Sequence, residues 1–156
     1  MEQGMAEKIQ GENEPLAADA AIDLHLHTHY SDGRWTPEAL LDHLQAAQFA
    51  LAAITDHDCF DRVPELQELA RQRQLRLLVG VEMTTTWRGE MTDLLCYGFD
   101  PLHAAMVEIA RDVLERQKQN TRQVCERLWQ QGCQLPEAVV EEVVAQPSSC
   151  QPHRLV

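Results

Sequence analysis

The densest group of side chains capable of chemistry lies in the segment DLHLHTHYSDG, which begins at Asp23. The alternation of apolar and polar residues predicts a strand over 22–28, which places Asp23, His25 and His27 on one face. Neutral imidazole is the commonest metal ligand, and two His residues separated by one residue on a strand can bind one cation together. Asp32 follows at loop spacing and adds a carboxylate. The segment therefore favours a metal site over a surface face that carries histidines by chance.

Two further candidates follow apolar runs. The tetrapeptide TDHD, which contains His57 and Asp58, ends a strand predicted over 49–55, and ligands in parallel α/β folds gather at the carboxyl ends of strands. A lone buried His is more often structural, but flanking carboxylates can supply His57 with charge and a hydrogen bond. Glu82 interrupts another apolar run, and an unpaired buried carboxylate is very costly. We expect Glu82 to be paired, protonated, metal-bound or at the end of its strand.

An alternating α/β fold must position these residues. Strands are predicted over 22–28, 49–55 and 76–87, helices over 37–47, 64–74, 101–131 (in one or two pieces) and 136–145, and the turn Arg88-Gly89 leads into a further strand over 91–98. Thr36 and Pro37 have the residue types of an N-cap and a first helical position, and Gly132 that of a C-cap. Residues 1–21 are predicted to be a disordered acidic tail. Residues 22–156 are predicted to form one domain that is incomplete at its C-terminus.

Composition limits the partners. The chain has 156 residues with 13 basic and 25 acidic side chains, and its formal charge is −12. This charge excludes an extended nucleic-acid surface, so a bound cation is the obvious way to attract phosphate. We found no apolar run long enough for a membrane span and no apolar core of an export signal, and we expect a cytoplasmic protein. The five cysteines form no CxxC pair and are expected to be reduced.

The stretches DLHLHTHYSDGRWTPEAL, ITDHD and LLVGVEMT resemble the PHP (polymerase and histidinol phosphatase) superfamily, and a weaker resemblance continues through ERQKQNTRQVCERLWQQG to QPH. The resemblance implies a distorted, TIM-like, seven-stranded β/α barrel, of which this chain would form the N-terminal half. It also implies up to three Mn, Zn or Fe ions. His25, His27 and Glu82 would hold one ion, Asp32 and His57 would belong to another, and Glu82 would bridge to the remaining site.

The subgroup that the chain looks most like contains stand-alone phosphoesterases that act on nucleoside bisphosphates or on the 5′ ends of short RNA. The resemblance therefore implies hydrolysis of a phosphate ester by a metal-activated hydroxide. Asp58 would orient His57 or relay a proton. Arg34 would grip a substrate phosphate, with a solvated surface Arg as the alternative.

The chain departs from the family pattern at two places. Asp93 stands in TDLLCYGFDP where the subgroup usually has a His. A carboxylate oxygen in place of an imidazole nitrogen gives the metal site a harder ligand, of the kind that Mn and Mg accept. His153 matches the His of a family segment RPHIA or is an ordinary loop residue, and the family continues beyond it. His29 is expected to lie in the loop after the first strand.

Two alternatives to the enzyme remain open at this point. One is a truncated or degenerate PHP-like module that binds metal or a partner without catalysis. The other is a structural metal protein that holds one ion through His, His and Glu. An incomplete barrel would expose apolar strand edges, which predicts self-association.

Overall fold

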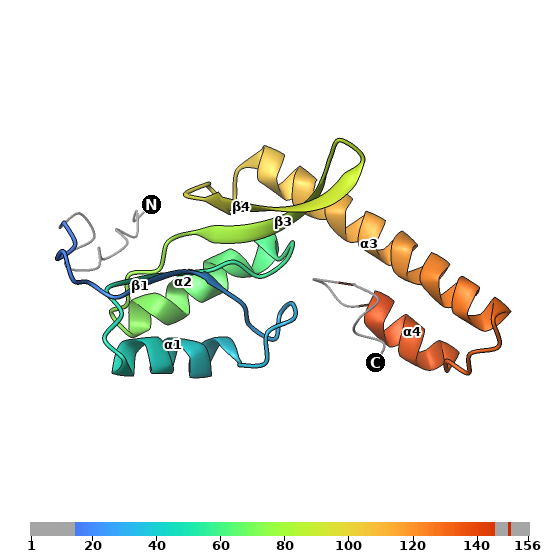
Figure 1. The fold of residues 1–156 in the computed structure, drawn as a ribbon, viewed down its shortest axis with the longest axis horizontal. Helices are drawn as coiled ribbons and strands as arrows, with labels where there is room; N and C mark the ends of the chain where they lie inside the picture. The colour runs from blue at the N-terminus through green and yellow to red at the C-terminus, as the bar shows by residue number, and fades with distance from the viewer. Residues whose placement is uncertain (1–14, 146–149, 151–156) are drawn as a thin grey trace, which may run out of the picture.

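The computed structural model describes residues 15–145 and residue 150 of the chain. Its elements follow one another in the order β1 (Ile22–Leu26), α1 (Pro37–Ala46), β2 (Leu51–Ile54), the short 3-10 helix η1 (Phe60–Arg62), α2 (Val63–Gln72), β3 (Gly80–Trp87), β4 (Glu90–Tyr97), α3 (Ala104–Gln130) and α4 (Glu137–Val144) (Figure 1). The predicted alternation of strands and helices is confirmed. The first 14 residues of the predicted acidic tail and the candidate His153 lie outside the described residues.

Local signals explain where the helices begin and end. The Thr36 hydroxyl caps α1 by accepting the Ala39 N–H at 3.2 Å, and Pro37 occupies the first turn. The region predicted as one or two helices forms the single helix α3 of 27 residues. Gly132 follows its C-cap with a φ of 84°, the left-handed conformation that ends many helices and that glycine adopts without strain.

Three chain segments run parallel and bring their carboxyl ends to one edge. β1 pairs with β2, and isolated bridges join β2 and the loop after it to the next segment, at Ala52–Leu77 and His57–Glu82. The prediction of one strand over 76–87 is wrong in its first part. Residues 76–79 pair with β2 only through the isolated bridge at Leu77, and regular strand pairing starts at Gly80, where β4 becomes the partner. The described residues form no closed barrel, so the barrel remains a prediction.

The predicted hairpin is confirmed. β3 and β4 pair in antiparallel register from Gly80–Tyr97 to Trp87–Glu90. Arg88 and Gly89 form its two-residue turn, with φ values of 52° and 86°. Positive φ at both positions matches the turn type whose twist suits a hairpin. The register sets Asp93 opposite Thr84, in the middle of β3.

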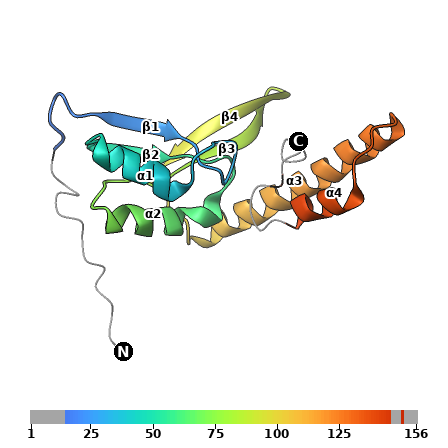
Figure 2. The ribbon, with the colours of Figure 1, turned by 90° about the horizontal axis from the view of Figure 1, so that it is seen from below.

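The main core lies between β1, β2 and the two helices that cover them, and Figure 2 shows α1 and α2 side by side on the same side of these strands. Leu40, Leu41 and Leu44 recur at helical spacing on α1, which gives that helix a buried stripe. The cluster consists of Leu40, Leu41, Leu44, Ala52, Ile54, Leu66, Ala70 and Leu75. Ala52, Ala53 and Ile54 of β2 are all buried, as expected for a parallel strand covered on both faces.

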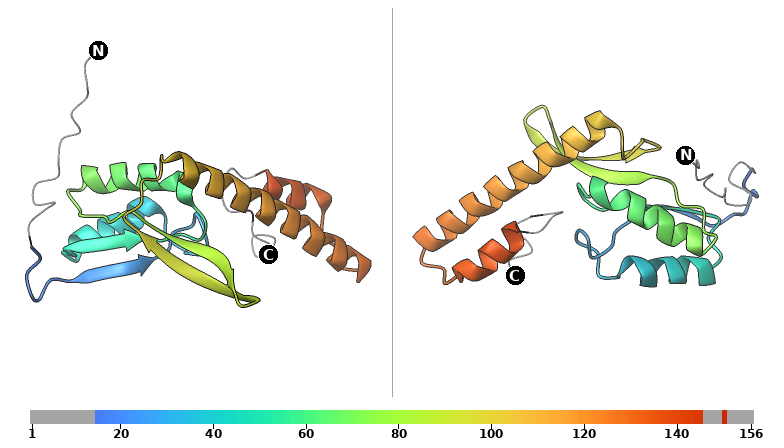
Figure 3. Two further views of the ribbon diagram at one scale, coloured as in Figure 1. Left: turned by 90° about the horizontal axis from the view of Figure 1, so that it is seen from above. Right: turned by 180° about the vertical axis from the view of Figure 1, so that it is seen from behind.

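α3 and α4 form a second packed unit. They lie side by side and extend away from the strands (Figure 3), and Cys125, Val140 and Val144 are buried between them. The first part of α3 crosses the β3–β4 hairpin (Figure 3), and the helix packs against η1. None of the helices in the described part of the chain is both long and apolar enough to span a membrane.

Candidate metal centre

Glu82 lies at the centre of the candidate site. One oxygen of its carboxylate, Oε2, lies 2.9 Å from Nε2 of His25, 2.9 Å from Nε2 of His27 and 3.7 Å from Nε2 of His57. The side chain is only 10% exposed, whereas His25 is half exposed. Of the outcomes expected for Glu82, the structure shows a paired carboxylate near the start of its strand. Residues from three parallel segments thus converge on one buried oxygen.

Asp32 extends this group through its two oxygens. Oδ1 lies 2.8 Å from Nδ1 of His27, and Oδ2 lies 3.9 Å from Nε2 of His57. Partial burial opposes ionisation of Asp32, but the neighbouring His27 and His57 outweigh it and lower the pKa of the carboxyl. One Asp32 oxygen can therefore orient the His27 ring while the other faces the His57 ring.

The donor atoms form three overlapping groups in the described part of the chain. In each group, one ligand atom per residue lies within 4.8 Å of the others: His25, His27 and Glu82; His27, Asp32 and His57; His57, Glu82 and Asp93. The hairpin register brings Asp93 into the third group, although the residue is exposed and follows the other members in the chain. His27, His57 and Glu82 each belong to two groups.

Asp56 anchors the loop that carries Asp32, a role that sequence reasoning missed. Its buried carboxylate accepts the Thr28 N–H at 2.7 Å, the Thr28 hydroxyl at 2.6 Å and the Ser31 hydroxyl at 2.7 Å. The adjacent His57 points to the site, so the loop after β2 both supplies a donor and holds the loop after β1. The only sequence signal was the pair of carboxylates around His57.

Gly33 lets the same loop turn back tightly against β1. A Cβ at this position would lie 2.3 Å from the carbonyl oxygen of His27 and 2.7 Å from the Thr28 nitrogen. The Gly33 N–H donates to the Thr28 carbonyl at 2.9 Å. Glycine is therefore required here by the close backbone approach, which keeps Asp32 beside His27.

Asp58 is buried, and the two described hydrogen bonds of its carboxylate lead away from His57. Oδ1 accepts the Thr84 N–H at 2.9 Å, and Oδ2 accepts the Gln117 amide at 2.7 Å. Burial raises the pKa of the Asp58 carboxyl, and these two donors partly offset that effect. The participation of Gln117, in α3, could not be anticipated from the sequence.

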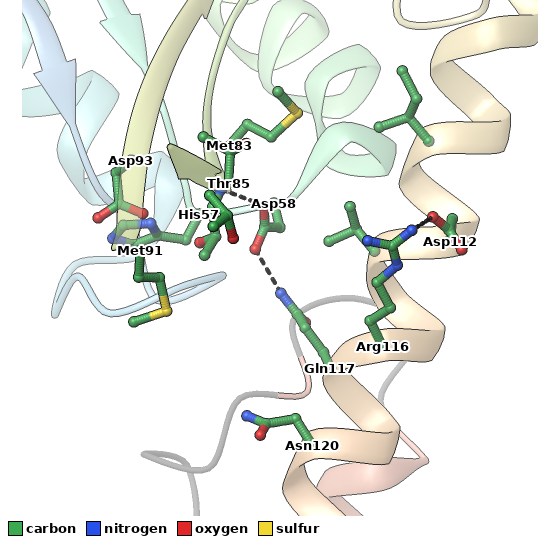
Figure 4. Close-up of a pocket in the computed structure, with 14 residues that line it drawn as sticks. His57, Asp58, Met83, Thr85, Met91, Asp93, Asp112, Arg116, Gln117 and Asn120 are labelled. Atoms are coloured by element: carbon green, nitrogen blue, oxygen red, sulfur yellow. Dashed lines mark hydrogen bonds and ion pairs between the residues drawn. The ribbon is translucent and has the colours of Figure 1, made fainter. Parts of the chain in front are cut away.

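A cavity of about 940 Å³ adjoins the candidate site (Figure 4). His57 and Asp93 lie together at one side, and Arg116, Gln117 and Asn120 approach from α3 at the other. Apolar atoms of Met83, Met91, Ile109 and Val113 complete much of the wall. The cavity has the size and mixed lining of a small-molecule pocket.

The structure places the remaining candidates at the margin. Arg34 is exposed in the loop after Gly33 and has no hydrogen bond or ion pair among the described contacts. His29 is exposed beside Tyr30, with ring centres 4.8 Å apart, and belongs to none of the three donor groups.

The donor set fits a divalent metal. Ligand atoms about 2.1 Å from one ion lie roughly 3.0–3.4 Å from each other, close to the spacings around Glu82 Oε2. Imidazole nitrogens with carboxylate oxygens suit Zn, Fe and Mn. Nδ1 of His57 is buried without a hydrogen-bond partner among the described residues. The fold and the site together define an α/β protein with a cluster of His and carboxylate donors that fits a divalent cation.

Comparison with known proteins gives the family. The PHP domain family matches residues 23–140, so the chain belongs to this family. It is 34% identical over 105 residues to the 3′,5′-nucleoside bisphosphate phosphatase of Chromobacterium violaceum, and the matched region covers 67% of this chain and 37% of the relative. It is 35% identical over 119 residues to the 5′-3′ exoribonuclease Rnm of Escherichia coli, and that matched region covers 75% of this chain and 40% of the relative.

Solved structures agree with this assignment. An amidohydrolase from Chromobacterium violaceum with bound sulfate and no metal matches with a TM-score of 0.73 and 28% identity, over 87% of this chain and 48% of that one. A protein from Bifidobacterium adolescentis described as a metal-dependent phosphoesterase matches with a TM-score of 0.71 and 25% identity, over 86% and 46%. The chain thus spans about two fifths of the curated relatives that it matches and just under half of these structures.

Proposed function

We propose that this PHP chain contributes the metal centre of a phosphoesterase that hydrolyses a phosphorylated nucleoside or the 5′ end of a short RNA. The observation that carries the proposal is the position of Glu82 Oε2, within 3.7 Å of imidazole nitrogens from His25, His27 and His57. Buried carboxylates are rarely surrounded in this way without a cation or protons to balance their charge.

The proposed ligands follow from the three donor groups. His25, His27 and Glu82 would hold one ion, and His57, Asp32 and Asp93 would take part in neighbouring positions that share His27, His57 or Glu82. Bound divalent ions supply two things to phosphate ester hydrolysis: a water molecule of lowered pKa and positive charge for the phosphoryl oxygens. Mn, Zn and Fe remain the candidate metals.

The protein's own side chains would orient these groups. Asp32 holds the His27 ring through Nδ1, which directs Nε2 toward Glu82. Asp58 fixes the backbone beside His57 and stays a candidate for proton relay. The exposed Arg34 would bind a phosphate oxygen of the substrate, because a guanidinium forms strong charge-assisted hydrogen bonds with phosphate.

The cavity beside His57 supports an organic group larger than phosphate. Its volume of about 940 Å³ is enough for a nucleoside, and amide, hydroxyl and thioether groups line it. The relatives named as a nucleoside bisphosphate phosphatase and as 5′-3′ exoribonucleases make a nucleotide the first substrate to test.

Phosphate release from a 3′,5′-nucleoside bisphosphate and from an aryl phosphate, with and without Mn²⁺, tests the proposal. We expect Mn²⁺-dependent turnover that falls at least about 100-fold in Glu82→Gln, with Glu65→Gln as a control of the same chemistry outside the donor groups. Bound metal without turnover would favour the structural metal protein or the non-catalytic module instead. Metal-independent turnover would contradict the proposal.

A further inference from the structure

The carboxylate of Asp58 is held from two sides by groups outside the proposed ligand set. Thr84, on β3, donates its N–H to Oδ1, and Gln117, on α3, donates its amide to Oδ2. Asp58 is also one of four non-glycine residues with positive φ in the described part of the chain, at 56°, a conformation that needs support from its surroundings. The residue directly after His57 thus keeps its conformation through contacts with β3 and α3.

The Asp58 backbone lies directly against the central ligand. Its N–H donates to the Glu82 carbonyl at 2.9 Å, and the Glu82 N–H donates to the Thr55 carbonyl at 3.1 Å. The chain from 55 to 58 is therefore joined to the start of β3 on both sides of His57. A shift of Asp58 would move the His57 ring relative to Glu82.

The other end of the Gln117 amide binds a third segment. Oε1 of Gln117 accepts the Cys150 N–H at 2.8 Å, and the Thr121 hydroxyl donates to the Cys150 carbonyl. Cys150 is fully buried. Figure 4 shows Gln117 reaching from α3 toward Asp58. One side-chain amide therefore links the loop of His57 to the chain at Cys150.

We infer that Gln117 is a positioning residue for the metal centre: its N–H fixes Asp58 and thereby His57, while its carbonyl separately holds the Cys150 backbone. The inference rests on the proposed function, because it assigns the purpose of the contact to metal binding. Only an amide makes both contacts at once, because it donates to a carboxylate and accepts from a backbone N–H. The metal centre itself depends on the donor half.

Two substitutions separate the halves of the amide. Lys in Gln117→Lys can donate to Asp58 but has no acceptor for the Cys150 N–H. Glu in Gln117→Glu can accept from Cys150 but, when ionised, has no proton for Asp58 and places a second carboxylate beside it. Gln123 is exposed on the same helix, so Gln123→Lys and Gln123→Glu are matched controls for charge.

The readouts are Mn²⁺ affinity by titration calorimetry and amide hydrogen exchange at Cys150 and Thr84. We expect Gln117→Glu to weaken Mn²⁺ binding at least about ten-fold, because His57 loses the support that Asp58 gives it, with the Thr84 amide exchanging faster and the Cys150 amide unchanged. We expect Gln117→Lys to keep Mn²⁺ affinity within about three-fold while Cys150 exchanges at least about ten-fold faster. Both Gln123 variants should match the wild type.

The failures are distinguishable. Equal loss of Mn²⁺ affinity in Gln117→Lys and Gln117→Glu would show a merely structural role and overturn the inference alone. Wild-type affinity in Gln117→Glu would overturn it as well. A wild-type protein that binds no Mn²⁺ would overturn the proposed function, and the positioning role with it.

Discussion

Asp56 binds Thr28 at two points, accepting the backbone N–H at 2.7 Å with one oxygen and the side-chain hydroxyl at 2.6 Å with the other. This bidentate contact joins the loop after β2 to the loop after β1, so the two loops that carry His57 and Asp32 form one unit. The Ser31 hydroxyl adds a third donor. Because Thr28 is fully buried, removing the carboxylate takes the acceptor from its N–H and its hydroxyl, whereas the Ser31 hydroxyl keeps the Asp32 carboxylate at 3.3 Å.

We predict that Asp56→Ala lowers the free energy of unfolding by about 3 kcal/mol, the cost of the two buried donors of Thr28 that lose their acceptor. Urea denaturation of the metal-free protein measures this change. Asp42→Ala is the control, because Asp42 is exposed and its ion pair with Arg73 should contribute less than about 1 kcal/mol. Equal effects of the two substitutions would contradict the anchoring role.

Gly33→Ala should impair metal binding without touching a ligand. The new Cβ would meet the His27 carbonyl at 2.3 Å, and backbone must move to relieve the clash. We expect Mn²⁺ affinity to fall at least about ten-fold, because His27 or Asp32 is displaced. Gly132→Ala, which also introduces strain but lies at the end of α3, should cost about 1 kcal/mol of stability and leave Mn²⁺ affinity unchanged.

Tyr30 gives a prediction for alkaline pH. Burial and the hydrogen bond that its hydroxyl donates to Glu65 raise the pKa of Tyr30 to about 12. Because the folded pKa exceeds the usual value near 10, the neutral phenol stabilises the fold fully below pH 10, and this contribution is lost as the pH rises toward 12. Tyrosinate absorbance after a rapid pH jump, in Tyr97→Phe, should titrate near pH 12.

Tyr30 is the sole tyrosine in that variant, so its signal is unambiguous. Adding Glu65→Gln should lower the midpoint, since the charged acceptor disappears. A midpoint near 10 in Tyr97→Phe with Glu65 intact would show that the Tyr30 hydroxyl is not held by Glu65.

Asp93→His tests the departure from the family pattern. The substitution replaces a hard oxygen donor beside His57 and Glu82 with an imidazole nitrogen. The metal preference of the site should therefore shift toward Zn²⁺ and away from Mn²⁺. Competition titrations with both metals measure the ratio of affinities, which we expect to change at least about ten-fold. An unchanged ratio would remove Asp93 from the proposed ligand set.

Strand periodicity and strand order predicted much of the site. Alternation placed His25 and His27 on one face, and the rule that parallel strands end at one edge predicted their meeting with His57 and Glu82. Both relationships are local or follow from topology. The break at Gly80 was missed, because the apolar run from Leu77 to Val81 continues through the change of pairing partner from β2 to β4.

Contacts between distant segments were beyond sequence reasoning. Gln117 lies 59 residues from Asp58 in the sequence. Glutamine is common on the solvent face of helices, so nothing in the surrounding sequence marks Gln117 as a partner of the site. The sequence suggested that Asp56 supports its neighbour His57, whereas its carboxylate accepts hydrogen bonds from Thr28 and Ser31. Such partners depend on how loops pack, which periodicity does not encode.

The most direct measurement is the number of Mn²⁺ ions bound per chain, by equilibrium dialysis and elemental analysis, in the wild type and in Glu82→Gln. Because Glu82 belongs to two of the three donor groups, we predict more than one tightly bound ion in the wild type and a loss of most of them in Glu82→Gln. Glu65→Gln should retain the wild-type number. Equal binding by Glu82→Gln and the wild type, or no binding by either, would contradict the shared metal centre.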